Sequence, residues 1–426
     1  MPSRRILITG LSTHWGGRLA RALEQDPDVE TVIGVDRTPP KIELERTEFV
    51  RVADSHSLIR RIVEAAEIDT VVDTRLVVDS IVTTPRRAHE NNVVGTMNVL
   101  AACGGPSSPV RKVVFKSSAH YYGAERDDPA FFTEDMRRPH PPRTLLERDI
   151  CDAEATVRDF ANRHRDVTVT VLRFANGLGA SVRSSAMALL SLPVVPGILG
   201  FDPRYQVIHE DDMTAVLEHA VRHDLGGVFN CAADGVLVLS EAVSLLGKPW
   251  APVLPPWGTG LAAGALRRAG VRIPPEMLQL LRYGRALDNR RLKATGYRYR
   301  FTTRETLLDL RRRQRLAPFL EPRSAYRYER EVEEFLRRSP SVRHALPAAD
   351  AAEPPANRPA AGGRAALAAA PRPSGDGYDG LRADEVIALL PSLDPDGLRA
   401  LRAHEAAHLA RKTVLAAIDR LLANRA

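Results

Sequence analysis

Hydrophobic residues in the N-terminal part of the chain form short runs, which are separated by segments with helical spacing. Between the first two runs, Leu19, Ala20 and Leu23 recur on one face of a helix. A regular alternation of strands with helices predicts an α/β fold built on a parallel sheet. The runs predict strands at residues 6–9, 31–35, 48–52, 69–72 and 110–115.

The segment at residues 4–37 combines a strand, a glycine turn, a helix, a second strand and an acidic residue. Gly10 permits a tight turn, and Gly16 lets the helix pack close to the strand, so that the helix N-terminus can bind a pyrophosphate. Asp36 follows the second strand, where a carboxylate can accept both hydroxyls of a ribose. The segment predicts a dinucleotide-binding unit with one departure, because Thr13 stands at the position of the middle glycine.

Length and cysteine content set broad limits on the protein. A chain of 426 residues can bury one full core and still carry a second module. Its three cysteines are widely spaced and odd in number, which predicts a reducing compartment and gives no disulfide or metal pattern. No run approaches the roughly 18 apolar residues of a membrane span, and no signal segment precedes the first strand. We therefore expect a cytoplasmic protein without a membrane span.

The net charge is +7, because 60 Lys and Arg residues outnumber 53 Asp and Glu residues. Only six of the 60 basic residues are lysine. Basic residues outnumber acidic ones between Arg282 and Arg343, a region that could face an anionic membrane, nucleic acid or a substrate phosphate, or simply water. The region contains no known nucleic-acid-binding module, which argues against a nucleic-acid partner.

Four passages together carry a resemblance to a known family. They are the glycine turn with Asp36, Asn92-Val-Val-Gly-Thr, Ser117-Ser118 followed by Tyr122-Gly123, and Arg173-Phe-Ala-Asn176-Gly-Leu-Gly179. With these passages the chain resembles an extended short-chain dehydrogenase/reductase of the NAD-dependent epimerase/dehydratase family over residues 4–315. The resemblance implies an α/β fold of the Rossmann type, a doubly wound parallel sheet with a smaller C-terminal substrate domain.

The resemblance also implies roles for individual residues and names NAD as the cofactor. Arg37, beside Asp36, leaves NADP open as an alternative. Ser118 falls on the catalytic serine, although a serine at a strand end can also be a simple cap. Asn176 falls on a residue that lines the substrate pocket. The cofactor-binding positions are Gly10, Thr13 and Gly16 at the phosphates, Asp36 at the adenosine ribose, Asp54 near the adenine, and Asn92, which supports the active site.

One departure from the family concerns its catalytic Tyr and Lys, which lie four residues apart on a helix so that the ammonium lowers the pKa of the phenol. Counting back from Glu154 places Leu146 and Ile150 at these positions. No tyrosine lies between Tyr122 and Tyr205, and no lysine lies between Lys116 and Lys248. The usual proton relay therefore cannot form on this helix.

A second departure follows the fourth strand, where the chain reads Asp73-Thr74-Arg75-Leu76. Arg75 either binds phosphate in place of the backbone that Thr13 displaces, or pairs with Asp73 and fills the site. Three residues near Ser118, namely Lys116, His120 and Tyr121, are candidates for a substitute acid or base. His120 and Tyr121 could equally be packing residues.

Composition divides the chain into three parts. We expect an epimerase/dehydratase-like domain at residues 1–345, with a Rossmann core at about 1–240 and substrate-binding parts at about 177–205 and 245–325. Residues 346–377 are mostly Ala, Pro, Gly, Arg and Ser, which predicts a disordered linker. Residues 378–426 predict a helical hairpin, whose second helix begins at Asp394-Pro395.

The second helix of this hairpin contains His404-Glu405-Ala406-Ala407-His408, formally a zinc-protease signature. That mechanism needs a third ligand and a cleft, for which the short remainder of the chain offers little. Leu401, His404, His408, Arg411, Leu415, Ile418 and Leu422 instead follow a heptad seam, which favours packing or a protein partner.

Two functions remain open from the sequence. The first is an NAD(P)-binding oxidoreductase, plausibly a homodimer, acting on a small molecule such as a sugar nucleotide or a sterol- or lipid-like alcohol. In it Ser118 orients the substrate and another group moves the proton. The second is a catalytically silent Rossmann protein that senses a nucleotide or organises partners through its hairpin. Loss of the Tyr and Lys favours the second function, and retention of Ser118, Asn92 and Asn176 favours the first.

Overall fold

The computed structural model describes residues 3–52, 55–105, 107–254, 264, 273–320, 383, 402, 405–406 and 410–423. Asp54, the expected linker at 346–377 and most of the expected hairpin lie outside these residues. The chain divides into two compact units, Met1–Phe335 and Leu336–Ala426, and each is described by itself.

The first unit is built on a sheet of seven parallel strands in the order β11-β6-β5-β4-β1-β2-β3. Successive strands are added outward from β1 in one direction and then from β4 in the other, so the order reverses between β1 and β4. Ligands of such sheets bind at this reversal, beyond the carboxyl ends of the strands. The strands are β1 Arg5–Thr9, β2 Thr31–Asp36, β3 Thr47–Arg51, β4 Thr70–Asp73, β5 Lys112–Ser118, β6 Thr168–Phe174 and β11 Gly227–Cys231.

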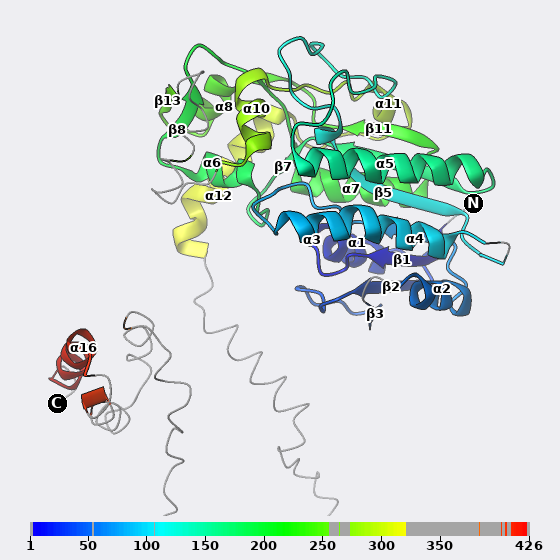
Figure 1. Cartoon of the computed structure of the whole chain (residues 1–426), viewed down its shortest axis with the longest axis horizontal. Coiled ribbons are helices and arrows are strands. Elements are labelled where there is room, and N and C mark those ends of the chain that lie inside the picture. The colour runs from blue at the N-terminus through cyan, green and yellow to red at the C-terminus, as the bar shows by residue number, and fades with distance from the viewer. Residues whose placement is uncertain are drawn as a thin grey trace, which may run out of the picture. The chain divides into compact units, whose positions relative to one another are not determined.

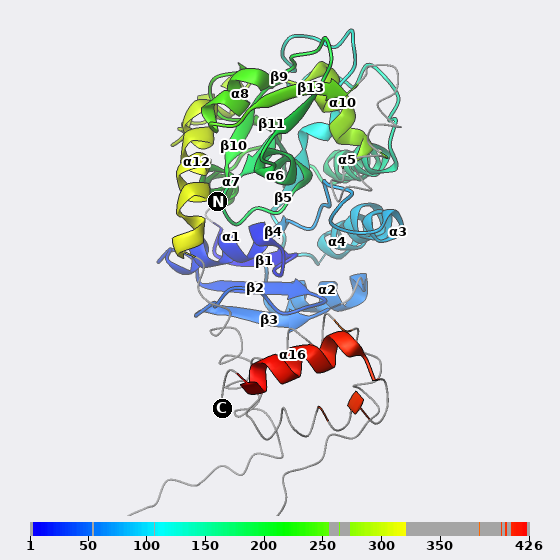
Figure 2. The same ribbon diagram turned by 90° about the vertical axis from the view of Figure 1, so that its left-hand side faces the viewer.

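Helices cover both faces of this sheet, as Figures 1 and 2 show. Helices α1 and α7 pack together on one face, and α2, α4 and α5 pack on the other. The predicted doubly wound Rossmann-type fold is confirmed. The helices are α1 His14–Glu24, α2 His56–Ala65, α3 Pro85–His89, α4 Gly95–Cys103, α5 Leu145–Arg163 and α7 Glu210–Arg222, with one π-helical turn at Glu90–Val94 and one 3₁₀ turn at Ala119–Tyr121.

Burial on both faces explains why the strands are continuous apolar runs. Ile6, Leu7 and Ile8 of β1 are fully buried in the main hydrophobic core. Helix α5 begins at the N-cap Thr144, whose hydroxyl accepts a hydrogen bond from the Glu147 backbone N–H. This start fixes the rotation of α5, so that one of its faces lies on the sheet.

A smaller part of the first unit has its own hydrophobic core, which includes Leu178, Val195, Leu239, Leu280 and Leu307. It lies beyond the carboxyl ends of the large sheet, where substrate-binding parts of such folds are built (Figure 1). Its strands are β7 Asn176–Leu178, β8 Val195–Ile198, β9 Arg204–Tyr205, β10 Val207–His209, β12 Leu237–Val238 and β13 Trp250–Leu254. Its helices are α6 Ser185–Ser191, α8 Leu239–Leu245, α10 Pro275–Tyr283 and α12 Thr303–Leu320, whereas α11 Arg290–Ala294 packs on β11 of the large sheet.

In the second unit, the described residues include helix α16, Lys412–Ala423. Ala410 has a φ of 47°, a left-handed conformation that interrupts a helix. The heptad seam expected along one continuous helix is therefore wrong, because α16 starts anew after this residue. Glu405 is fully buried and forms a salt bridge with Arg411 at 2.8 Å, so its carboxylate is already engaged. His404 and His408 lie outside the described residues.

No helix within the described ranges is both long and apolar enough to span a bilayer.

Candidate functional site

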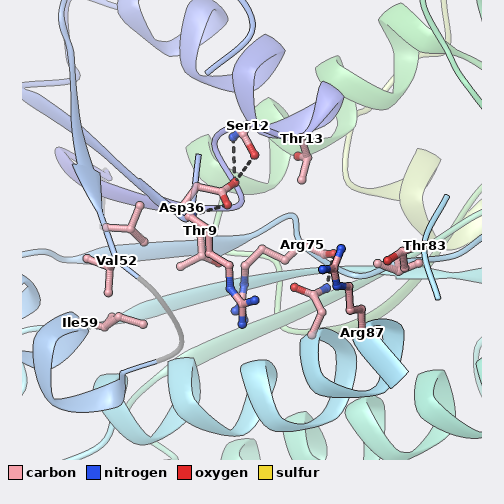
Figure 3. A pocket seen from close by; sticks show the side chains of 13 residues that line it. Thr9, Ser12, Thr13, Asp36, Val52, Ile59, Arg75, Thr83 and Arg87 are labelled. Carbon is pink, nitrogen blue, oxygen red and sulfur yellow. Dashed lines mark hydrogen bonds between the residues drawn. The ribbon is translucent and has the colours of Figure 1, made fainter. Parts of the chain in front are cut away.

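A cavity of about 250 Å³ opens where the strand order reverses, at the carboxyl ends of β1, β2 and β4. Figure 3 shows the side chains that surround it. Apolar groups gather at one end, near Val52 and Ile59, and basic groups, Arg75 and Arg87, gather toward the other (Figure 3). The lining residues are Thr9, Ser12, Thr13, Val35, Asp36, Arg37, Val52, Ile59, Arg75, Val77, Thr83, Arg87 and Asn91.

The glycine turn after β1 requires both of its glycines. Gly10 has a φ of +84°, a conformation that other residues rarely adopt. A Cβ atom at position 16 would lie 2.2 Å from the carbonyl oxygen of Gly10. Gly16 therefore lets α1 start against the end of β1, as the sequence predicts.

Thr13 is the N-cap of α1. Its hydroxyl donates a hydrogen bond to the Gly10 carbonyl at 2.7 Å and accepts one from the Gly16 backbone N–H at 3.0 Å. This N–H belongs to the first turn of α1, whose N–H groups would otherwise face an anion. Thr13 thus stabilises the turn, and its hydroxyl occupies the Gly16 N–H, which is then no longer available to an anion.

Asp36 lies at the end of β2, and its carboxylate faces the turn. It accepts hydrogen bonds from the backbone N–H and the hydroxyl of Ser12, at 2.9 and 2.6 Å (Figure 3). The Arg37 backbone N–H donates a third, at 2.7 Å. A carboxylate held in this way at the cavity edge can accept further hydrogen bonds from ribose hydroxyls.

Asp73 and Arg75 form an ion pair beside the glycine turn, which is one of the two arrangements that the sequence left open. The guanidinium donates to both carboxylate oxygens of Asp73, at 3.0 and 2.9 Å, and Thr9 donates a further hydrogen bond. Burial alone would raise the pKa of Asp73, but Arg75 and these hydrogen bonds hold it below its ordinary value. The stem of Arg75 lies against Gly10, because a Cβ there would come within 2.6 Å of the Arg75 Cγ.

Asn92 is fully buried and does not line the cavity. Its amide binds the backbone of Val77 twice, accepting from the N–H at 2.7 Å and donating to the carbonyl at 2.8 Å. Asn91 lines the cavity instead and donates to the Arg75 carbonyl at 2.7 Å. Asn92 therefore positions the segment after β4, and Asn91 is the residue of this pair at the cavity surface.

Ser118 ends β5 and caps the 3₁₀ turn that follows. Its hydroxyl lies 2.9 Å from Nδ1 of His120 and also accepts the His120 backbone N–H at 3.2 Å. Burial, together with the nearby guanidinium groups of Arg285 and Arg138, lowers the pKa of His120 well below 6.5. The structure thus places a serine beside a neutral imidazole, although neither residue lines the cavity at the strand reversal.

The two positions at which the sequence predicts replacement of the family's Tyr and Lys carry core side chains. Leu146 and Ile150 are 5% and 0% exposed on the sheet-facing side of α5. Tyr121 is also a packing residue, since the Arg173 guanidinium lies 3.6 Å above its ring. Lys116 is buried in β5, and burial lowers its pKa to about 8.

Asn176 lines a small hollow at the junction with the smaller part of the first unit. Arg204, Tyr205 and Arg285 share its wall. The Tyr205 hydroxyl is buried and has no hydrogen-bond partner among the residues that the structure describes. An unsatisfied buried hydroxyl at a polar hollow suits the binding of a polar ligand group there.

We expect the stability of the protein to depend on pH through His120. Its pKa is lowered in the folded state and is about 6.5 in the unfolded chain, so below that pH only the unfolded chain gains the proton. The free energy of unfolding should therefore fall on acidification below pH 6.5, by up to about 1.4 kcal/mol per pH unit from this group. His120→Gln should show a shallower slope in denaturant titrations at several pH values, and an unchanged slope would contradict the assignment.

The model of the NAD dependent epimerase/dehydratase family matches residues 6–232, more than half of the chain. The chain belongs to this family. Uncharacterized proteins of Mycobacterium tuberculosis and Mycobacterium bovis are each 35% identical to it over 336 residues, which cover 76% of this chain and 88% of theirs.

Solved structures of epimerases and dehydratases share the fold. A UDP-glucose 4-epimerase of Thermotoga maritima, solved with UDP-glucose, is 19% identical with a TM-score of 0.56, covering 74% of this chain and 99% of its own. A dTDP-glucose 4,6-dehydratase of Bacillus anthracis, solved with NAD, is 17% identical with a TM-score of 0.54, covering 74% and 97%. At these identities the likeness shows the fold alone.

Within this epimerase/dehydratase fold, several cavity residues were not predicted from the sequence. Ser12, Thr83, Arg87 and Asn91 line the cavity, and only the position of Ser12 inside the glycine turn gave a signal that could have indicated it. Asp54, predicted near the adenine, lies outside the described residues.

Proposed function

We propose that the chain binds NAD in the cavity at the strand reversal and acts as an oxidoreductase on a small molecule, for which sugar nucleotides are the first class to test. The observation that carries the proposal is the cavity itself. Asp36 offers a ribose acceptor, Val52 and Ile59 offer an apolar slot for a base, and Arg75 and Arg87 offer positive charge for phosphates. NADP stays an alternative because Arg37 also lines the cavity.

In this proposal, Ser118 and His120 replace the family's Tyr and Lys in moving the proton. Bound NAD would supply the acceptor for a hydride taken from the carbon of a substrate alcohol. The alcohol proton would pass to Ser118 Oγ while the serine proton passes to Nδ1 of His120, which requires the tautomer with the ring proton on Nε2. The lowered pKa of His120 keeps the imidazole neutral and able to accept.

The substrate would lie toward the hollow that contains Asn176. Asn176, Arg204 and Arg285 line this hollow, whose volume is only about 10 Å³, so the substrate would lie against it and not inside it. Cationic and amide donors suit the diphosphate and hydroxyl groups of a sugar nucleotide. A sterol-like alcohol would instead need an apolar wall, so the polar lining favours the sugar nucleotide.

Turnover with NAD and either UDP-glucose or dTDP-glucose tests this proposal, with the sugar products followed by nuclear magnetic resonance. Ser118→Ala and His120→Gln should each lower turnover by roughly 100-fold or more, since general acid–base groups contribute on that order. The matched control is Ser117→Ala, because the Ser117 hydroxyl binds Glu154 and not His120. Turnover that survives both substitutions, with NAD still bound, would contradict the assigned pair.

A catalytically silent nucleotide sensor is the second candidate, and one observation favours it. Arg75 lies between the glycine turn and α4, since its guanidinium would come within 2.8 Å of a Cβ at Gly95. Held there by Asp73, it could separate the cavity from Ser118 and admit only the adenosine and phosphate portions of a nucleotide. Equal affinities for NAD and ADP-ribose, without turnover of any sugar nucleotide, would support this function.

A further inference from the structure

The glycine turn of this chain has less capacity to bind phosphate than its geometry first suggests. The Gly16 N–H is bound by the Thr13 hydroxyl at 3.0 Å, and the Ser12 N–H is bound by Asp36 at 2.9 Å. Both donors lie where the end of a helix would normally meet an anion. A phosphate in the cavity therefore needs donors from elsewhere.

Two arginines, Arg75 and Arg87, also line the cavity. Arg75 is charge-compensated by Asp73, at 2.9 Å. Arg87 reaches the cavity from α3, as Figure 3 shows, and no ion pair or side-chain hydrogen bond engages it within the described ranges. Its neighbour Arg86 does not line the cavity and binds Glu90 at 3.0 Å. Arg87 is thus a cation on the cavity wall whose charge is open to a ligand.

We propose that Arg87 on α3, together with Arg75, whose stem lies against Gly10, binds the pyrophosphate of the nucleotide in this cavity. This assignment rests on the proposed nucleotide binding and adds the groups that hold the phosphates. Arg75 is fixed in place by its two bonds to Asp73 and presents an ordered donor edge. Arg87 is exposed and can close on the ligand, so the pair joins one rigid and one mobile guanidinium. Such groups form strong, charge-assisted bonds to phosphate oxygens.

Calorimetric titration of the full chain with NAD, ADP-ribose and adenosine tests this assignment. Arg87→Gln should lower the affinity for NAD and for ADP-ribose by roughly 10- to 100-fold, because both ligands carry the pyrophosphate. The affinity for adenosine, which has no pyrophosphate, should stay unchanged. Arg87→Lys should retain part of the affinity, since it keeps the charge without the planar fork. Because Arg87→Gln removes a positive charge, the affinity of this variant for NAD should also depend less on salt concentration.

Arg86→Gln is the matched control, one residue away on the same helix and outside the cavity, and it should bind like the wild type. Equal affinities of Arg87→Gln and Arg86→Gln for ADP-ribose would overturn the assignment while leaving nucleotide binding intact. An equal loss for adenosine would also overturn it. Failure of the wild type to bind either pyrophosphate ligand would instead overturn both the assignment and the proposed function.

Discussion

Glu154→Ala is expected to lower the free energy of unfolding by roughly 3–5 kcal/mol, because it leaves a buried guanidinium without its partner. Glu154 on α5 and Arg173 on β6 are each 5% exposed, and their closest approach is 2.6 Å. Arg173 also donates to the Tyr122 hydroxyl at 2.8 Å, so it cannot turn toward water without breaking a second contact. The pair therefore joins α5 to the sheet beneath the site.

Urea titration measures the loss of stability in Glu154→Ala, and two other variants serve as comparisons. Glu241→Ala removes one partner of an exposed ion pair with Arg304 and should cost no more than about 1 kcal/mol. Replacing both Glu154 and Arg173 by leucine should cost less than Glu154→Ala, since no uncompensated charge is left. A loss below about 1 kcal/mol for Glu154→Ala would show that solvent reaches the pair.

Gly16→Ala is expected to reduce stability by roughly 1–3 kcal/mol and nucleotide affinity at least about tenfold, whereas Gly17→Ala should do neither. Both residues lie in α1, so both gain a similar helix propensity from alanine. The added Cβ at position 16 would lie 2.2 Å from a backbone oxygen. At position 17 it would lie 3.2 Å from the flexible Ile42 side chain.

Thermal unfolding and NADH titration of the two variants give the comparison. A loss of affinity confined to Gly16→Ala would place the ligand at the junction of β1 and α1. Identical behaviour of the two alanine variants would contradict the close packing on which the site depends.

The strands were predictable because both faces of the sheet are covered, which makes each strand an uninterrupted apolar run. The second strand was expected at 31–35 and is found at Thr31–Asp36. The fifth was expected to end at residue 115 but continues to Ser118. Ser117 and Ser118 pair with Arg173 and Phe174 of β6, and such long-range pairing leaves no local signal. The break at Ala410 was also hidden, since a left-handed residue is usually glycine or asparagine.

The residues of the candidate site were predictable where the local backbone requires a particular residue type. They were not predictable where side chains from distant segments come together. Gly10, Gly16 and Asp36 stand in a local pattern, and the structure places them together at the turn. For Arg75 the sequence left two roles open, phosphate binding or a pair with Asp73, and the structure shows the pair. The reach of Arg87 into the cavity depends on where α3 packs, and the Ser118–His120 contact depends on a 3₁₀ turn. Neither arrangement has a sequence signature.

Calorimetric titration of the wild-type protein with NADH tests the central claim most directly, because every other proposal depends on a nucleotide in this cavity. The account predicts saturable binding of one equivalent with a dissociation constant in the micromolar range, weakened by Gly16→Ala and unaffected by Gly17→Ala. No binding of NADH, NADPH or their oxidised forms at millimolar concentration would contradict it, and would indicate that Thr13 and Arg75 close the site.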